Sequence, residues 1–156
     1  MKTSSPPTRF IYYMYGLKDK IENGSVFVLS LIFGLAALGK TLGLSAAHEY
    51  ISNLLNTSRG ISWILLLILL FAEYACSLTL QLRRCRHLGL LISIFLTYNF
   101  VLFELFWPQS HCPCFGPIAT YVPFLMSGGL IFKVPIFGIA LLATYIHTLQ
   151  MYHFKR

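Results

Sequence analysis

Four long apolar runs, separated by short polar segments, set the pattern of this chain. The runs cover roughly residues 25–43, 61–82, 88–107 and 130–152. A helix needs about 20 apolar residues to cross a hydrocarbon core about 30 Å thick, and each run is close to that length. The pattern therefore predicts an all-α integral membrane protein whose fold is a four-transmembrane-helix bundle.

Two amphipathic segments flank the first apolar run. Residues 9–22 mix aromatic rings with lysines and acids, and residues 45–56 carry apolar side chains at helical spacing. Aromatic and basic side chains favour the headgroup layer, and an amphipathic helix can lie flat in that layer. We expect short interfacial helices here, the first of them ending at Asn23 and Gly24; for residues 9–22 a plain solvated segment is the alternative.

The composition favours a membrane protein over a soluble one. Hydrophobic residues make up 56% of the chain and charged residues only 11%, whereas soluble domains are about 25% charged. The net charge is +7, but the basic residues lie in short clusters between the apolar runs. This is how a bilayer sorts charge, so we expect the lipid bilayer as a partner and no nucleic acid.

The distribution of basic residues predicts the orientation. With both termini in the cytoplasm, nine lysines and arginines lie inside and three, Lys40, Arg59 and Lys133, lie at the outer boundary. This agrees with the positive-inside rule. The expected organisation is a cytoplasmic or interfacial segment at 1–24, a transmembrane domain at 25–152 and a cytoplasmic tail at 153–156.

A cysteine motif between the third and fourth apolar runs is the strongest candidate for chemistry. Residues 111–117 read His-Cys-Pro-Cys-Phe-Gly-Pro, so Cys112 and Cys114 are separated by one residue. Two thiols at this spacing can close a small, strained disulfide ring, and strained disulfides exchange readily. The predicted orientation places this loop on the outer side of a bacterial inner membrane, facing the periplasm or exterior, where disulfides persist.

Five further residues are candidates for supporting that chemistry. Positive charge favours a thiolate, and ionisable residues within spans are costly enough to suggest function. Lys40 and Lys133 can serve the thiols or simply snorkel to the interface. Glu104 can accept protons or pair with a lysine, and Glu73 can hydrogen-bond in the bundle or handle protons or quinone. His111 adjoins the motif.

The other cysteines and histidines carry less signal. Cys76 and Cys85 lie toward the cytoplasmic side of the predicted bundle, away from the motif. The remaining histidines are scattered and suggest no metal site. Soft thiolates do suit Cu(I), so handling of Cu(I) or another soft metal by Cys112 and Cys114 is one alternative function.

Several motifs together resemble the MauE branch of the DoxX-like membrane proteins. They are Cys-x-Cys-Phe-Gly at 112–116, Phe-Gly followed by Gly-Lys-Thr-Leu within 33–42, and Glu73 followed by the small and apolar stretch 75–80. The resemblance covers about residues 25–150. It implies a four-helix membrane bundle associated with thiol–disulfide chemistry.

The resemblance also implies roles for particular residues. Cys112 and Cys114 match the redox pair, and Lys40 and Glu73 match the polar residues of the spans. Pro113 stands where a glycine is usual, which stiffens the motif. MauE-like proteins are implicated in making disulfides in exported partners, and other relatives occur beside thioredoxin-like proteins.

These observations predict a membrane thiol–disulfide redox protein, a possible thiol–disulfide oxidoreductase. Cys112 and Cys114 would exchange disulfides or electrons with an exported thioredoxin-like partner or a cysteine-containing substrate. Electrons can then pass to or from a quinone in the bundle. A different class of function is also open: a non-catalytic subunit that assembles or positions a larger membrane or exported complex.

Overall fold

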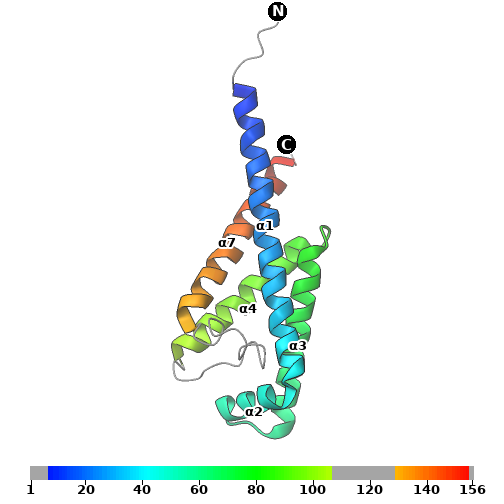
Figure 1. Cartoon of the computed structure of the whole chain (residues 1–156), viewed down its shortest axis with the longest axis vertical. Coiled ribbons are helices and arrows are strands. Elements are labelled where there is room, and N and C mark those ends of the chain that lie inside the picture. The colour runs from blue at the N-terminus through cyan, green and yellow to red at the C-terminus, as the bar shows by residue number, and fades with distance from the viewer. Residues whose placement is uncertain (1–6, 107–128, 155–156) are drawn as a thin grey trace, which may run out of the picture.

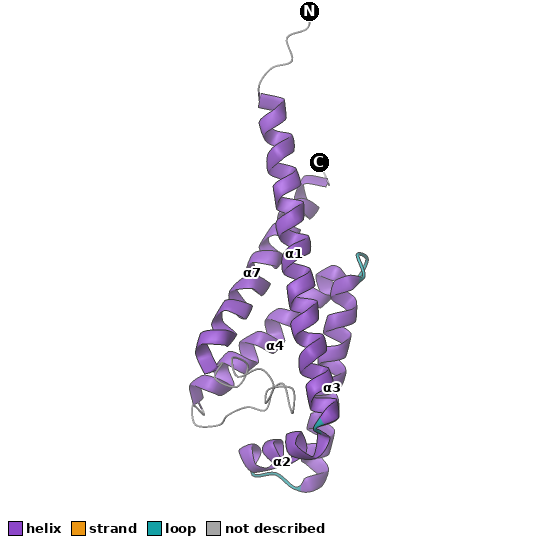
Figure 2. Cartoon of the chain, viewed as in Figure 1, coloured by secondary structure: helices purple, strands orange, loops and turns teal. Residues whose placement is uncertain are grey.

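The computed structural model of the chain describes residues 7–106 and 129–154. Within these residues every regular element is a helix and none is a strand (Figures 1 and 2). This confirms the predicted all-α class. The helices are α1 (Pro7–Leu42), α2 (Leu44–Leu55), α3 (Arg59–Gln81), α4 (Arg86–Phe106) and α7 (Gly129–Phe154).

Three of the described helices are long and apolar enough to cross a membrane. They are α3, α4 and the part of α1 at Gly16–Leu42, and α7 contains a shorter apolar stretch at Lys133–Leu149. Large apolar side chains such as those of Phe27, Phe71 and Phe95 point outward and are exposed. Outward apolar surface of this kind is compatible with a lipid bilayer, as the composition predicts.

The N-terminal segment differs from the expected interfacial helix. α1 runs unbroken through Asn23 and Gly24, so the prediction that a first helix ends there is wrong. Glu22 and Val26, on either side of this point, are both buried. The buried face of the helix therefore continues across Gly24, and a glycine in a helix costs only about 1 kcal/mol relative to alanine.

α2 is the amphipathic helix expected between the first two apolar runs. Its Ala47 packs against Leu66 and Leu70 of α3, which fixes α2 across the N-terminal half of that helix. The helix ends at Leu55, and the next residue, Asn56, has a left-handed φ of 47°, a conformation that asparagine tolerates at such positions. The location of α2 in the headgroup layer stays a prediction.

The four longer helices pack in a ring, in which α1 contacts α3, α3 contacts α4, α4 contacts α7 and α7 contacts α1. The core between them includes Leu29, Phe33, Leu80 and Leu90. Gly89 lets α4 approach α3 closely, because a Cβ there would lie 2.8 Å from the backbone nitrogen of Leu80. Small residues commonly permit such close contacts between membrane helices.

The ring has two distinct ends. The start of α1, the α3–α4 turn and the end of α7 lie toward one end, whereas α2 lies toward the other (Figure 1). At the α2 end, the last turn of α4 meets the first turns of α7, where Glu104 contacts Lys133. This arrangement brings the charged residues singled out from the sequence close to one another.

Candidate functional site

A buried ion pair joins α1 to α3. The Lys40 Nζ lies 2.6 Å from Oε1 of Glu73, and the two residues are only 4% and 0% exposed. Lys40 therefore does not snorkel to the interface, and its Nζ lies 5.8 Å from the centroid of the Phe100 ring. Among the described residues Glu73 Oε2 has no hydrogen-bond partner. Charges this deeply buried persist because they are paired.

The same helix interface carries further hydrogen bonds, and we call it the α1–α3 seam. The Ser77 hydroxyl donates to the Ser30 carbonyl at 2.9 Å, and the Gln81 amide donates to the Ser30 hydroxyl at 2.9 Å. Gly34 lies opposite, where a Cβ would be 3.2 Å from Ser77 Oγ. The α1–α3 seam comprises Ser30, Gly34 and Lys40 of α1 with Glu73, Ser77 and Gln81 of α3.

A second ion pair joins α4 to α7. The Lys133 Nζ lies 2.5 Å from Oε2 of Glu104, and the side chains are 16% and 15% exposed. Glu104 lies in the last turn of α4 and Lys133 in the first turns of α7. Of the two roles that the sequence left open for Glu104, this contact shows pairing with a lysine.

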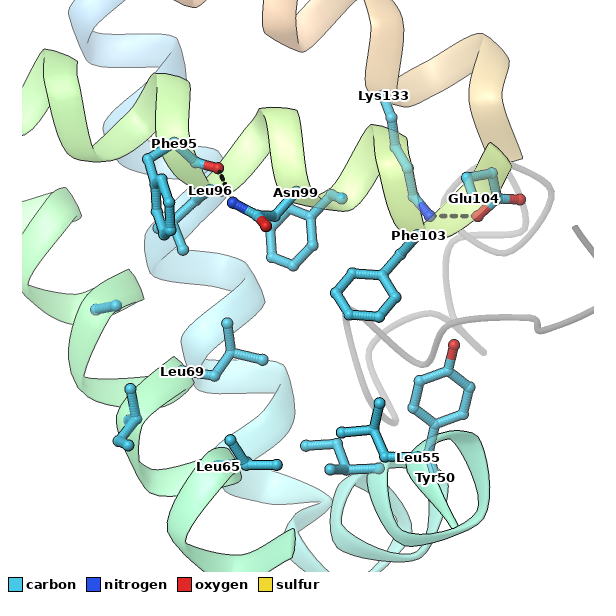
Figure 3. Close-up of a pocket in the computed structure, with 14 residues that line it drawn as sticks. Tyr50, Leu55, Leu65, Leu69, Phe95, Leu96, Asn99, Phe103, Glu104 and Lys133 are labelled. Atoms are coloured by element: carbon cyan, nitrogen blue, oxygen red, sulfur yellow. Dashed lines mark hydrogen bonds and ion pairs between the residues drawn. The ribbon is translucent and has the colours of Figure 1, made fainter. Parts of the chain in front are cut away.

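An apolar cavity of about 290 Å³ lies between α2, α3, α4 and the start of α7 (Figure 3). Its walls are mostly aliphatic and aromatic side chains. Glu104 and Lys133 form one side, where Figure 3 shows their ion pair. The aromatic rings of the cavity come from Tyr50 of α2 and from Phe95, Phe100 and Phe103 of α4.

A smaller cavity of about 40 Å³ lies between Lys40 and the large one. The two cavities have four lining residues in common, so one layer of side chains separates them. Phe100 belongs to that layer and also lies over the Lys40 ammonium. Each ion pair therefore borders one of two adjacent cavities, and the two pairs come from different helix pairs. The shared residues are Tyr50, Ile51, Leu69 and Phe100.

The structure places four of the seven residues predicted for the site. Lys40 pairs with Glu73 and Lys133 pairs with Glu104. The other three, His111, Cys112 and Cys114, lie outside the described residues. The described part of the site therefore consists of two ion pairs and the two cavities that they border.

A charged cluster at the opposite end of the ring was not predicted. Glu22 is 2% exposed, and its Oε1 lies 3.1 Å from Arg86 of α4 and 3.0 Å from His147 of α7. This cluster ties α1, α4 and α7 together at that end of the ring. A sequence signal for it exists, because Glu22, Val26 and Leu29 share helical spacing and thus one face of α1.

The remaining cysteines occupy places that suit packing. Cys76 is fully buried, and its thiol donates a weak hydrogen bond to the Gly89 carbonyl at 3.5 Å. Cys85 is exposed in the turn between α3 and α4.

His48 stacks on Trp63 with ring centroids 4.4 Å apart, which fastens α2 to α3.

Comparison of the chain with protein-family models, with curated proteins and with solved structures gives no match. The resemblance to the MauE branch therefore stays a prediction from the motif residues.

Proposed function

We propose that the chain is a membrane thiol–disulfide redox protein. Cys112 and Cys114 exchange a disulfide with an exported thioredoxin-like protein or a cysteine-containing substrate. The observation that carries this proposal is the Glu104–Lys133 ion pair. It joins the end of α4 to the start of α7, the two helix ends between which the cysteine motif stands in the sequence.

The ion pair supplies the acid–base chemistry that disulfide exchange requires. In one direction, the Cys112–Cys114 disulfide and two partner thiols become a partner disulfide and two thiols on this chain. The attacking thiol must lose a proton, and the departing thiolate must gain one. The Glu104 carboxylate is a proton acceptor, and the Lys133 ammonium favours a thiolate near it.

The proposal includes four membrane spans with both termini in the cytoplasm of a bacterial cell. Support for the fourth span comes from α7, which packs on α4 and α1 and contains the apolar stretch Lys133–Leu149. Support for the orientation comes from Arg86, which begins α4 and contacts Glu22 near the start of the apolar part of α1. Basic residues of the α3–α4 turn thus share one end of the ring with the N-terminal part of α1.

Thiol labelling of intact cells tests both the chemistry and the orientation. A membrane-impermeant thiol reagent, followed by peptide mapping, should label Cys112 and Cys114 only after a reductant has been added. Cys85 is the internal control, because it should label only after the membrane has been permeabilised. Free labelling of both motif cysteines without reductant would exclude a resting disulfide and contradict the proposal.

The double variant Cys112→Ser/Cys114→Ser separates this function from a purely structural one. A redox protein should lose all disulfide exchange in this variant while it keeps its helical circular dichroism spectrum. If the variant supports its cellular role as well as the wild type does, the chain acts as a non-catalytic subunit instead.

A further inference from the structure

The electron balance of the proposed function requires an acceptor beyond the motif. After each exchange that oxidises a partner, Cys112 and Cys114 are left as thiols, and reclosing their disulfide releases two electrons and two protons. Cys76 is buried against Gly89, and Cys85 is exposed in the α3–α4 turn. These two cysteines do not form a disulfide that could take the electrons, so a two-electron acceptor must come from elsewhere.

The 290 Å³ cavity has the properties of a site for such an acceptor. Ligand pockets usually measure about 300–1,000 Å³, so this one suits a single substituted ring better than a whole lipid. Two of its lining residues, Ile68 and Phe95, are 60% and 66% exposed on the outer surface of the helices. The cavity therefore borders the surface that lipids would cover, and a ligand can reach it from the membrane.

The cavity also combines aromatic walls with a polar side. Phe100 and Phe103 offer ring faces and edges against which a flat ring can pack. The Lys133 ammonium and the Tyr50 hydroxyl are hydrogen-bond donors in the walls. Asn99 donates its amide N–H to the Phe95 carbonyl at 2.7 Å, which orients its carbonyl oxygen as an acceptor.

We propose that this cavity binds the ring of a membrane quinone, which reoxidises the cysteine pair. The inference rests on the proposed function and names its electron acceptor. Two cysteine thiols and one quinone become one disulfide and one quinol, so that two electrons and two protons move together. Lys133 and Tyr50 donate to the quinone oxygens, and Asn99 accepts from the quinol hydroxyl.

The smaller cavity lies between the large cavity and the buried ion pair. It measures about 40 Å³, Lys40 lines it, and Glu73 is bonded to Lys40. Apart from Lys40 and Tyr50 its lining is apolar, and apolar cavities stay dry, so the Lys40–Glu73 pair takes no part in the proposed reaction. A phospholipid tail in the large cavity would need no polar side wall.

Binding is tested apart from thiol chemistry in the Cys112→Ser/Cys114→Ser variant of the full chain. Titration of the purified protein with decylubiquinone should give saturable binding. Ala72→Phe, which fills the cavity from α3, should raise the Kd at least tenfold. Ala75→Phe is the matched control, because Ala75 is half-buried on the same helix and lines neither cavity. Its Kd should stay within twofold.

A second variant keeps the test informative if Ala72→Phe does not fold. Lys133→Met removes a donor without adding bulk and should raise the Kd at least threefold, with the circular dichroism spectrum unchanged. The site is overturned if neither variant changes the Kd. It is also overturned if mass spectrometry finds a copurified phospholipid that decylubiquinone does not displace.

Turnover by the wild type then separates the site from the function. A dithiol-reduced sample should consume decylubiquinone, as followed by its ultraviolet absorbance, and Ala72→Phe should lower that rate at least tenfold. Quinone binding in a protein that shows no disulfide exchange with a dithiol would overturn the redox function while the quinone site stands. Disulfide exchange that is normal in Ala72→Phe and independent of quinone would overturn the site while the function stands.

Discussion

The two lysine–glutamate pairs have the same chemistry but differ in how deeply their side chains are buried. Lys40–Glu73 lies within the α1–α3 seam with side chains 5% and 0% exposed, whereas Lys133–Glu104 joins two helix ends with side chains 16% and 15% exposed. Desolvation makes the first pair costly, and each partner there is tolerated only because of the other. The second pair is less deeply buried, so breaking it should cost the fold less.

The largest expected effect is on stability and concerns the buried pair. Lys40→Met should lower the free energy of unfolding by about 3–5 kcal/mol, because it leaves Glu73 buried without its compensating charge. The measurement is reversible unfolding in mixed micelles, followed by circular dichroism. The variant and the wild type should be compared under the same detergent and salt conditions.

The double variant Lys40→Met/Glu73→Leu tests the reason for that loss. Replacing both charges with apolar side chains of similar size should recover most of the stability, since a buried pair is often no more stable than an apolar replacement. A double-mutant cycle isolates the coupling between the two residues. A double variant as unstable as the single one would contradict the importance of the pairing.

The next effect tests how closely the α1–α3 seam is packed. Gly34→Ala should cost about 1–3 kcal/mol, because its Cβ would lie 3.2 Å from a hydroxyl held by hydrogen bonds to Ser30. Gly24→Ala is the control on the same helix, where a Cβ meets nothing within 4 Å. That change should stabilise the protein by about 0.4–1 kcal/mol. Equal effects at the two positions would show that the seam is loosely packed.

Much of the helical framework follows from the sequence, because an apolar run has to be covered by lipid or by other helices. The run predicted at 61–82 is observed as Arg59–Gln81, and that predicted at 88–107 as Arg86–Phe106. The candidate charges of the site were also recognisable, since ionisable residues within apolar runs are rare. Glu22 was missed because residues 9–22 were assigned to a separate helix.

The partners of those charges could not be predicted in the same way. Lys40 lies in the last turn of α1, whereas Glu73 lies near the middle of α3. If the ends of both helices lay at the same membrane surface, the two residues would lie at different depths in the membrane. α2 removes this difference: it packs on the N-terminal half of α3, so that the middle of α3 is level with the end of α1. Such an offset depends on tertiary packing and has no local sequence signal.

The smallest effect on stability, and the clearest separation of the two pairs, is expected at the second pair. Glu104→Gln should change the free energy of unfolding by at most about 1 kcal/mol, since the amide oxygen can still accept the hydrogen bond from Lys133 and a typical hydrogen bond contributes about that much. The same variant should slow disulfide exchange with a small dithiol at least tenfold, because general base catalysis typically contributes about 10²–10⁴-fold. Stopped alkylation of the thiols gives the rate, and Glu49→Gln, an exposed acid on α2, should leave it unchanged. If Glu104→Gln exchanges at the wild-type rate, the outer pair is as purely structural as the buried one, and the contrast between them fails.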